Sequence, residues 1–141
     1  MPEEEYTIPI GRAKVLSEGS DVTIIAWGAM VFQCLSVLDQ LPENISADLI
    51  DLRTIYPPDI ETIAESVRKT GRAVVVHEAP KTAGFAAEVS SIIQEHCFLQ
   101  LEAPVQRVTG FDTVMPYYKL EQQYLPDGPR IARAVRECFA Y

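Results

Sequence analysis

His77 and Glu78 are the two side chains whose types and position could support chemistry most directly. They follow the β-branched run 73–76, which is typical of a buried strand, and they precede a loop and an amphipathic helix. A histidine can act as an acid, a base or a hydrogen-bond donor near pH 7, and Glu78 would then orient it or pair with Lys81 or an arginine. The interpretation that we favour is structural. In it, His77 caps the sheet and hydrogen-bonds a loop carbonyl, and Glu78 lies in an intersubunit contact.

Asp112 and Asp51 are two further acids near the ends of predicted strands. Asp112 lies between a strand and the Pro- and Tyr-rich stretch 116–118, where an Asx-turn would account for it. Asp51 could mimic the ribose-binding acid of a dinucleotide site, but the turn at Trp27-Gly28 has one glycine where the fingerprint needs three. A strand end with Arg53 as charge partner explains Asp51 more simply, so a nucleotide site is the weaker interpretation.

Metal ligands and nucleophiles are sparse. His77, Glu78 and His96 lack the spacing of a zinc site, and a helix end, where an imidazolium complements the dipole, accounts for His96. The sequence has no G-x-S-x-G turn for a serine nucleophile. The odd number and wide spacing of Cys34, Cys97 and Cys138 favour buried free thiols in a reducing compartment over a disulfide framework. We therefore expect no metal site and no nucleophilic residue.

The elements that must position these residues alternate along the chain. Strands are predicted over 21–27, 47–52, 73–76 and 103–110, and helices over 30–41, 60–70, 84–96 and 129–139. Asp59 is the expected N-cap of the second helix and Gly71 its C-terminal glycine. Residues 111–128 are predicted to form an irregular segment without a regular helix or strand. Four strands alternating with helices predict a mostly parallel sheet and an α/β fold, specifically a three-layer α/β/α sandwich.

Composition and charge restrict the class of protein. The 141 residues suit one domain, and 48% hydrophobic with 23% charged residues is ordinary globular composition. The net charge of −8 argues against nucleic acid and is compatible with a basic protein partner, although an acidic surface that only keeps the protein in solution is the simpler interpretation. No apolar stretch approaches the about 20 residues of a membrane-spanning helix, and the acidic triplet at 3–5 is unlike a signal peptide. We expect neither a nucleic-acid nor a membrane partner.

Four groups of residues, in order along the chain, resemble one family. They are Gly19-Ser20-Asp21-Val22-Thr23 with Ala26-Trp27-Gly28; Asp51-Leu52-Arg53-Thr54-Ile55 with Pro57; His77-Glu78-Ala79-Pro80 with Gly84-Phe85; and Leu101-Glu102-Ala103-Pro104 with Arg107-Val108 and Asp112-Thr113. Together they resemble the C-terminal, transketolase-C-like domain of the E1 β subunit of 2-oxoacid dehydrogenase complexes. The resemblance covers 6–141 and is greatest to the branched-chain (2-oxoisovalerate) members, with the pyruvate type as the alternative. One departure is Val114-Met115-Pro116, where the family more often has Pro-Phe-Pro.

The resemblance implies an activity that the chain alone would not carry. The family decarboxylates 2-oxo acids oxidatively on thiamine diphosphate with Mg²⁺ and passes the acyl group to lipoyl-E2. The cofactor lies between the α subunit and an N-terminal domain of β that is absent here. Residues 1–18 are then a lead-in from that domain, and 19–141 form the transketolase C-terminal-like domain. No cofactor ligand and no catalytic residue are expected in it, and the isolated domain should be inactive.

The implied role is assembly. The expected partners are the E1 α subunit, a second β subunit and the basic peripheral subunit-binding domain of E2. Candidate interface residues are His77, Glu78, Asp112, Phe139 and Tyr141. The location would be cytoplasmic in a bacterium and the mitochondrial matrix in a eukaryote. Loss of the N-terminal half would expose Phe111, Tyr118 and Tyr124. A free-standing module that binds a nucleotide or a small anion is the alternative from a different class.

Overall fold

A computed structural model describes residues 6–141, and the acidic triplet at 3–5 lies outside the described residues. The chain forms the following elements. The strands are β1 (Lys14–Ser17), β2 (Val22–Ala26), β3 (Ala47–Asp51), β4 (Ala73–Pro80) and β5 (Gln106–Gly110). The helices are α1 (Met30–Leu38), α2 (Ile60–Thr70), α3 (Phe85–Cys97), the short 3₁₀ helix η1 (Phe98–Gln100), α4 (Glu121–Tyr124) and α5 (Gly128–Phe139).

The five strands form one sheet in the order β1-β3-β2-β4-β5. Strands β3, β2, β4 and β5 are parallel, and β1 pairs antiparallel with β3 at the edge. After β2 the chain moves outward to β3 and then crosses back past β2 to reach β4. The strand order therefore reverses between β2 and β4, and the carboxyl ends of these two strands flank the switch point.

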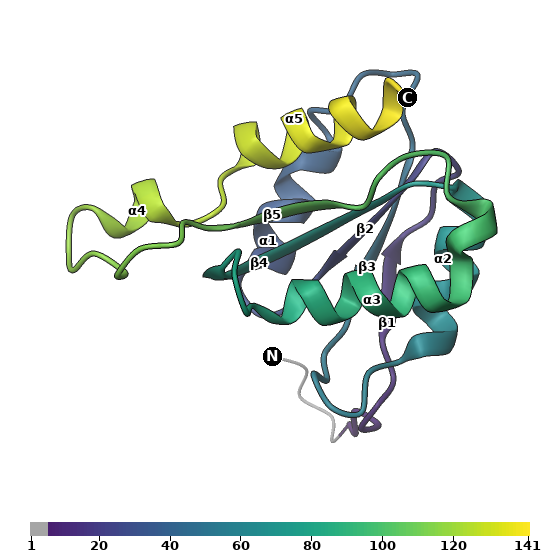
Figure 1. Cartoon of the computed structure of the whole chain (residues 1–141), viewed down its shortest axis with the longest axis horizontal. Helices are drawn as coiled ribbons and strands as arrows, with labels where there is room; N and C mark the ends of the chain where they lie inside the picture. Colours follow the sequence, from purple (N-terminus) through teal and green to yellow (C-terminus); the bar gives the residue numbers. More distant parts are fainter. Residues whose placement is uncertain (1–5) are drawn as a thin grey trace.

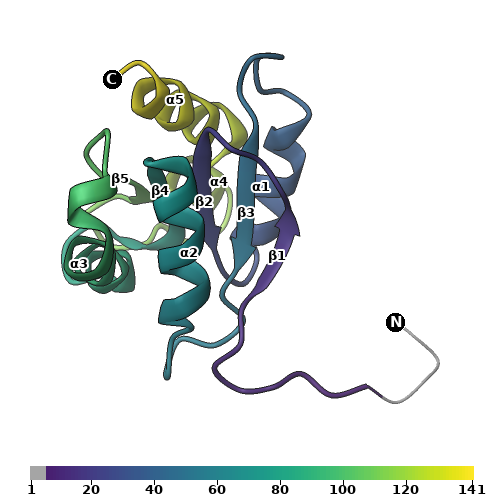
Figure 2. The same cartoon turned by 90° about the vertical axis from the view of Figure 1, so that its right-hand side faces the viewer.

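Helices cover both faces of the sheet (Figure 2). Helices α1 and α5 pack on one face, over side chains such as Ile24, Leu49 and Val74. Helices α2 and α3 pack on the other face, over Ile25 and Val75. Adjacent residues of one strand point to opposite faces, which is why two separate clusters of buried side chains form. The predicted α/β fold with a mostly parallel sheet is confirmed.

Strand β1 was not predicted from the sequence. It lies within the segment 1–18 that the sequence indicates as a lead-in, yet Lys14 and Val15 pair with Asp51 and Ile50 of β3. Four residues are too few to show a convincing alternation of apolar and polar side chains. This strand borders solvent on its outer side, and its four side chains are exposed or half-buried, so it lacks the mark of a buried strand.

Both predicted ends of α2 are confirmed, whereas α1 ends at Leu38, three residues before the end predicted from the sequence. Asp59 accepts a hydrogen bond from the backbone N–H of Thr62 at 3.2 Å, and Gly71 ends α2 in the left-handed region at φ 67°. The segment between β5 and α5 carries α4 and projects from the body of the domain (Figure 1). Among residues 6–141, no helix is both long and apolar enough to cross a lipid bilayer.

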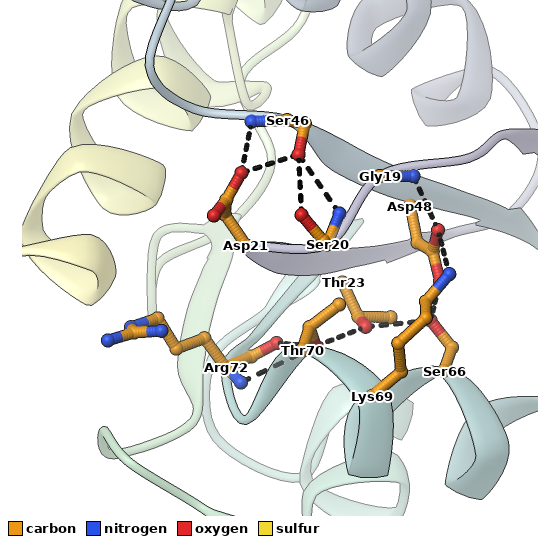
Figure 3. A network of polar contacts seen from close by, with 10 residues as sticks. All are labelled: Gly19, Ser20, Asp21, Thr23, Ser46, Asp48, Ser66, Lys69, Thr70 and Arg72. Carbon is orange, nitrogen blue, oxygen red and sulfur yellow. Dashed lines mark hydrogen bonds and ion pairs between the residues drawn. The ribbon is translucent and has the colours of Figure 1, made fainter.

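A polar network closes the amino end of the sheet (Figure 3). The Asp48 side chain is 2% exposed; it accepts hydrogen bonds from Gly19 N and Lys69 Nζ, both at 2.7 Å, and from the Ser66 hydroxyl. Ser66 Oγ in turn lies 2.7 Å from Thr23 Oγ1. The network joins α2 to β2 and β3, and its buried polar groups are partnered, as stability requires. We therefore assign this end of the sheet a structural role.

Candidate functional site

A hollow of about 710 Å³ lies at the carboxyl end of the sheet. It is lined by Trp27, Gly28, Ala29, Ile55, His77, Glu78, Ala79, Pro80, Phe85, Thr113, Met115 and Tyr124. These residues come from the turn after β2, the end of β4, the start of α3 and the segment after β5. Open parallel sheets bind ligands at this kind of position, outside the carboxyl ends of strands where the order reverses. The hollow is therefore the candidate site.

His77 lies inside β4, three residues before its end, and not behind the strand as predicted from the sequence. It is only 2% exposed. Its Nε2 atom has no hydrogen-bond partner among the described residues, so the predicted bond to a loop carbonyl is not made by this atom. Burial, together with the positive charge of Arg107, lowers the pKa of the imidazole from its ordinary value. The structure thus favours a neutral imidazole.

Trp27 and Gly84 lie against the His77 ring. The Trp27 ring lies 5.3 Å away, centroid to centroid, and itself packs edge-on against Phe85 at 5.4 Å. On another side stands Gly84, the N-cap of α3. A Cβ atom at Gly84 would lie 2.4 Å from both His77 Cε1 and the Pro80 carbonyl oxygen. The glycine is therefore required for the helix to start this close to the imidazole.

Glu78 is exposed at the rim of the hollow. Among the described residues, 6–141, Glu78 forms no ion pair with Lys81 or with an arginine. Arg107 instead donates to the Lys81 carbonyl oxygen at 3.2 Å. The pairing that the sequence suggested is absent, and Glu78 supplies the one ionised side chain of the lining.

Asp112 connects two loops across the rim. Its carboxylate accepts hydrogen bonds from Thr82 N and Thr82 Oγ1, both at 2.8 Å. The backbone N–H of Thr82, then its hydroxyl, lower the pKa of the carboxyl. These bonds to a residue thirty positions away replace the Asx-turn expected from the sequence. They also hold the loop in which Ala83 adopts φ 58°, an uncommon conformation for a residue with a side chain.

Phe139 and Tyr141 lie at the other end of the domain. The Arg72 guanidinium, just before β4, sits 5.5 Å above the half-buried Phe139 ring, and Tyr141 is exposed. Because β4 runs from Ala73 towards Pro80, Phe139 borders the amino end of the sheet and His77 the carboxyl end. The five predicted interface residues therefore form two separate groups.

Sequence reasoning missed the role of Arg130. Its guanidinium lies 4.5 Å over the Phe111 ring and donates to the carbonyl oxygens of Tyr124 (3.3 Å), Leu125 (3.1 Å) and Thr109. It thereby fixes both ends of 111–127, which we call the arm. Tyr124 is buried against Phe111, contrary to the prediction that it is exposed. A lone arginine in a helix gives no sequence signal for such contacts.

Residues 6–141 give no support for a metal site or for a reactive thiol. The described residues contain no group of three or more metal-ligating side chains. The three cysteines are free and buried, as predicted, and burial raises the pKa of Cys34 to about 12. Asp51 accepts a hydrogen bond from the backbone of Arg53 and lies 3.9 Å from its guanidinium, in agreement with the simpler interpretation.

Comparisons with known proteins place these features in context. Residues 11–131 match the family model of the transketolase C-terminal domain. The chain is 50% identical to the mitochondrial 2-oxoisovalerate dehydrogenase subunit beta of Dictyostelium discoideum and 48% identical to the pyruvate dehydrogenase E1 component subunit beta of Bacillus subtilis (strain 168). Each alignment covers 100% of this chain, but only 38% and 44% of those relatives. A solved split-gene transketolase, described as an inactive beta4 tetramer, is similar with a TM-score of 0.83 and 29% identity, over 96% of this chain and 44% of that one.

Proposed function

Because the chain belongs to the transketolase C-terminal domain family, as its motifs predicted, we propose that it is the C-terminal domain of an E1 β subunit that acts on branched-chain 2-oxo acids. The observation that carries this proposal is the 50% identity, over the whole chain, to a 2-oxoisovalerate dehydrogenase β subunit. Pyruvate is the second candidate substrate, because the identity to a pyruvate dehydrogenase E1 β subunit is almost the same.

We further propose that this domain contributes assembly and leaves the chemistry to other parts of the enzyme. The whole enzyme would decarboxylate the 2-oxo acid with thiamine diphosphate and Mg²⁺. The residues around the hollow do not fit that cofactor. Its diphosphate needs basic side chains or a glycine cradle, and its Mg²⁺ needs a cluster of oxygen ligands. The lining supplies aromatic and aliphatic side chains with the single carboxylate of Glu78, so no step of the reaction is assigned to it.

The proposed partners are the E1 α subunit, a second β subunit and the peripheral subunit-binding domain of E2. The two groups of interface residues support separate contacts: one at the carboxyl end, with His77, Glu78 and Asp112, and one around Phe139 and Tyr141. The net charge of −8 supports a basic partner, because complementary charge accelerates encounter. The split-gene transketolase, described as a beta4 tetramer, supports association of like chains.

The proposal is tested by calorimetry and turnover. The chain is titrated with thiamine diphosphate in the presence of Mg²⁺ and assayed for decarboxylation of 2-oxoisovalerate. We expect neither binding heat nor turnover. Saturable binding with turnover would show that the chemistry resides in this domain. A thermal-shift series with nucleotides addresses the free-standing module, because a ligand at a hundred times its Kd should add roughly 2.7 kcal/mol of stability.

The role of His77 is tested in the whole E1 enzyme. If His77 is structural, we expect His77→Ala to lower stability or subunit association and to leave kcat per assembled site unchanged. Analytical ultracentrifugation gives the assembled fraction, and steady-state kinetics give kcat. A fall in kcat with assembly intact would instead make His77 a catalytic residue.

A further inference from the structure

Two side chains bind the backbone of residues 11–13, the segment that we call the strap. The Gly11 N–H donates to Thr54 Oγ1 at 3.1 Å, and the Ala13 N–H donates to Asp59 Oδ2 at 2.9 Å. Both acceptors belong to the loop between β3 and α2, so these are long-range contacts and not a local turn. Strand β1 begins at the residue after the strap. The chain is therefore fixed in place before it enters the sheet.

Asp59 uses both of its carboxylate oxygens. Oδ1 accepts from Thr62 N at 3.2 Å, which is the bond that an N-cap makes, and Oδ2 accepts from Thr62 Oγ1 and Ala13 N at 2.9 Å each. The residue is 5% exposed. Burial acts to raise the pKa of the carboxyl, but the hydrogen bonds from Ala13 and Thr62 outweigh it, and the pKa is lowered. One ionised carboxylate thus forms charge-assisted bonds to both α2 and the strap. Capping the helix needs only one of the two oxygens.

Gly11 fixes the direction in which the preceding residues leave the domain. Its φ is 74°, a conformation that favours glycine. A Cβ atom there would lie 3.1 Å from Pro57 Cγ, so the strap approaches the loop ahead of α2 closely. Figure 2 shows residues 6–10 running from below β1 away from the body of the domain, beside that loop. The turn and the two hydrogen bonds together set the course of this segment.

The loop 52–59, which we call the bridge loop, also reaches the hollow. Thr54 and Asp59 bind the strap, whereas Ile55, between them, lines the hollow. The loop is anchored at its start, because Leu52 is fully buried and its N–H donates at 2.9 Å to the carbonyl oxygen of the last residue of β2. At its end, Asp59 is held by the first turn of α2. The strap and this wall of the hollow are therefore parts of one rigid unit.

We propose that Asp59 is a positioning residue, which holds the part of the β subunit that precedes this domain in a fixed orientation to the hollow. The inference rests on the proposed function, in which that preceding part carries thiamine diphosphate and the carboxyl end of the sheet serves assembly. A flexible connection would leave the two parts free to move relative to each other. Asp59 acts through the strap and touches neither substrate nor cofactor. It influences the rate because a displacement of about 1 Å, caused far from the chemistry, can slow a reaction about a hundredfold.

Matched variants separate the two roles of Asp59. Asp59→Asn keeps an oxygen for the cap, and asparagine is as good an N-cap as aspartate. Its amide nitrogen, in place of Oδ2, cannot accept from Ala13 N. Asp59→Ser is a second variant that also retains a capping oxygen, but its side chain is too short to reach the strap. The control is Thr62→Val, which removes the hydroxyl bond to Oδ2 and leaves the bond from Ala13 intact.

Amide hydrogen exchange of the 141-residue chain, resolved by NMR, measures the strap directly. We expect both Asp59 variants to speed exchange of the Ala13 amide at least about tenfold, because they remove its bond to an ionised acceptor. Thr62→Val should leave this amide as it is in the original chain. The amides of β2 should stay protected in all three variants, because the strap opens without the sheet. A residue that only stabilised the fold would change the exchange of strap and sheet alike.

Trypsin provides an independent readout, because the strap contains Arg12. Arg12 lies 3.5 Å from Glu61, but both side chains are more than half exposed, so this pair contributes little to holding the strap. Cleavage between Arg12 and Ala13 requires the strap to open, and its rate follows the population of the open form. We expect cleavage there, followed by mass spectrometry, to be about tenfold faster in the Asp59 variants than in Thr62→Val.

The same variants test the consequence in the whole E1 enzyme. Asp59→Asn should lower kcat at least about tenfold while the assembled fraction stays unchanged, and Thr62→Val should keep the original kcat. Three results would overturn the proposal: an Ala13 amide that neither Asp59 variant alters, exchange that rises equally in strap and sheet, or full kcat in an enzyme whose strap has been released. A failure of the proposed function looks different. The strap then opens as expected in the 141-residue chain, but the original whole enzyme decarboxylates no 2-oxo acid, and the positioning role fails with it.

Discussion

Replacing Gly84 with alanine is the most direct perturbation of the packing around His77. The new Cβ would meet His77 Cε1 and the Pro80 carbonyl oxygen at 2.4 Å each, against an ordinary contact of 3.4–4 Å. The imidazole cannot withdraw freely, because it is buried and packs against Trp27. The Pro80 carbonyl oxygen belongs to the backbone. The start of α3 must therefore move by about 1 Å, and overpacking of this kind typically costs 1–3 kcal/mol.

Two smaller effects at Gly84 act in opposite directions. Alanine lowers the entropy of the unfolded chain, which stabilises by roughly 0.4–1 kcal/mol where the backbone conformation is allowed, as it is at φ −77° and ψ 151°. Alanine is also a poorer N-cap than glycine, and this loss offsets much of that gain. We expect Gly84→Ala to lower the free energy of unfolding by about 2 kcal/mol, or the melting temperature by roughly 6–8 °C.

Urea denaturation monitored by circular dichroism measures this change. The control is Gly128→Ala at the start of α5, where the new Cβ would meet only Val37 Cγ2 at 3.4 Å. This control should stay within about 0.5 kcal/mol of the original chain, or exceed it slightly, because alanine is the better helix former. If Gly84→Ala is as stable as Gly128→Ala, His77 is not packed as described.

Three further substitutions test the network, the imidazole and the arm. Lys69→Ala should lower the free energy of unfolding, measured by urea denaturation, by about 1–2 kcal/mol, because it leaves the buried Asp48 carboxylate without its cation. This loss is smaller than for a fully buried ion pair because the Lys69 side chain is 48% exposed. An equal loss in the control Lys14→Ala would contradict this. The lowered pKa of His77 means that the unfolded chain binds a proton more readily than the folded one, so stability should fall as the pH drops below about 6.5. His77→Gln should remove that part of the slope, and an unchanged pH profile would refute the assignment. Arg130→Lys should lower the free energy of unfolding by about 2 kcal/mol and make the arm sensitive to limited proteolysis, because an ammonium cannot replace the guanidinium fork. An arm that stays resistant to the protease would contradict the role assigned to Arg130.

Much of the fold could be predicted because its signals are local. A β-branched run marks β4, Asp59 and Gly71 mark the ends of α2, and the alternation of strands and helices implies a parallel sheet. Each of these features depends on residues that are close in sequence. The short edge strand β1 escaped prediction because its four residues acquire their structure from β3, more than thirty positions away.

The candidate site was only partly predictable because its decisive contacts are long-range. The sequence indicated His77 and Glu78, at the end of a predicted strand, as the side chains best placed for chemistry, and both line the hollow. It did not indicate that Asp112 binds Thr82, that Arg130 clamps the arm, or that Tyr124 is buried. One signal was available and overlooked. Thr23 and Asp48 are polar residues inside otherwise apolar strands, and such residues must find buried partners such as Ser66.

Titration with the E2 peripheral subunit-binding domain tests most directly the proposal that this domain serves the assembly of an enzyme whose chemistry lies in other parts. Isothermal calorimetry should give saturable binding that weakens as salt screens the acidic surface. Tyr141→Ser, at an exposed position, should raise the Kd, whereas Tyr117→Ser/Tyr118→Ser should leave it unchanged. Absence of binding at low salt, or binding that needs Tyr117 and Tyr118 but not Tyr141, would contradict the account.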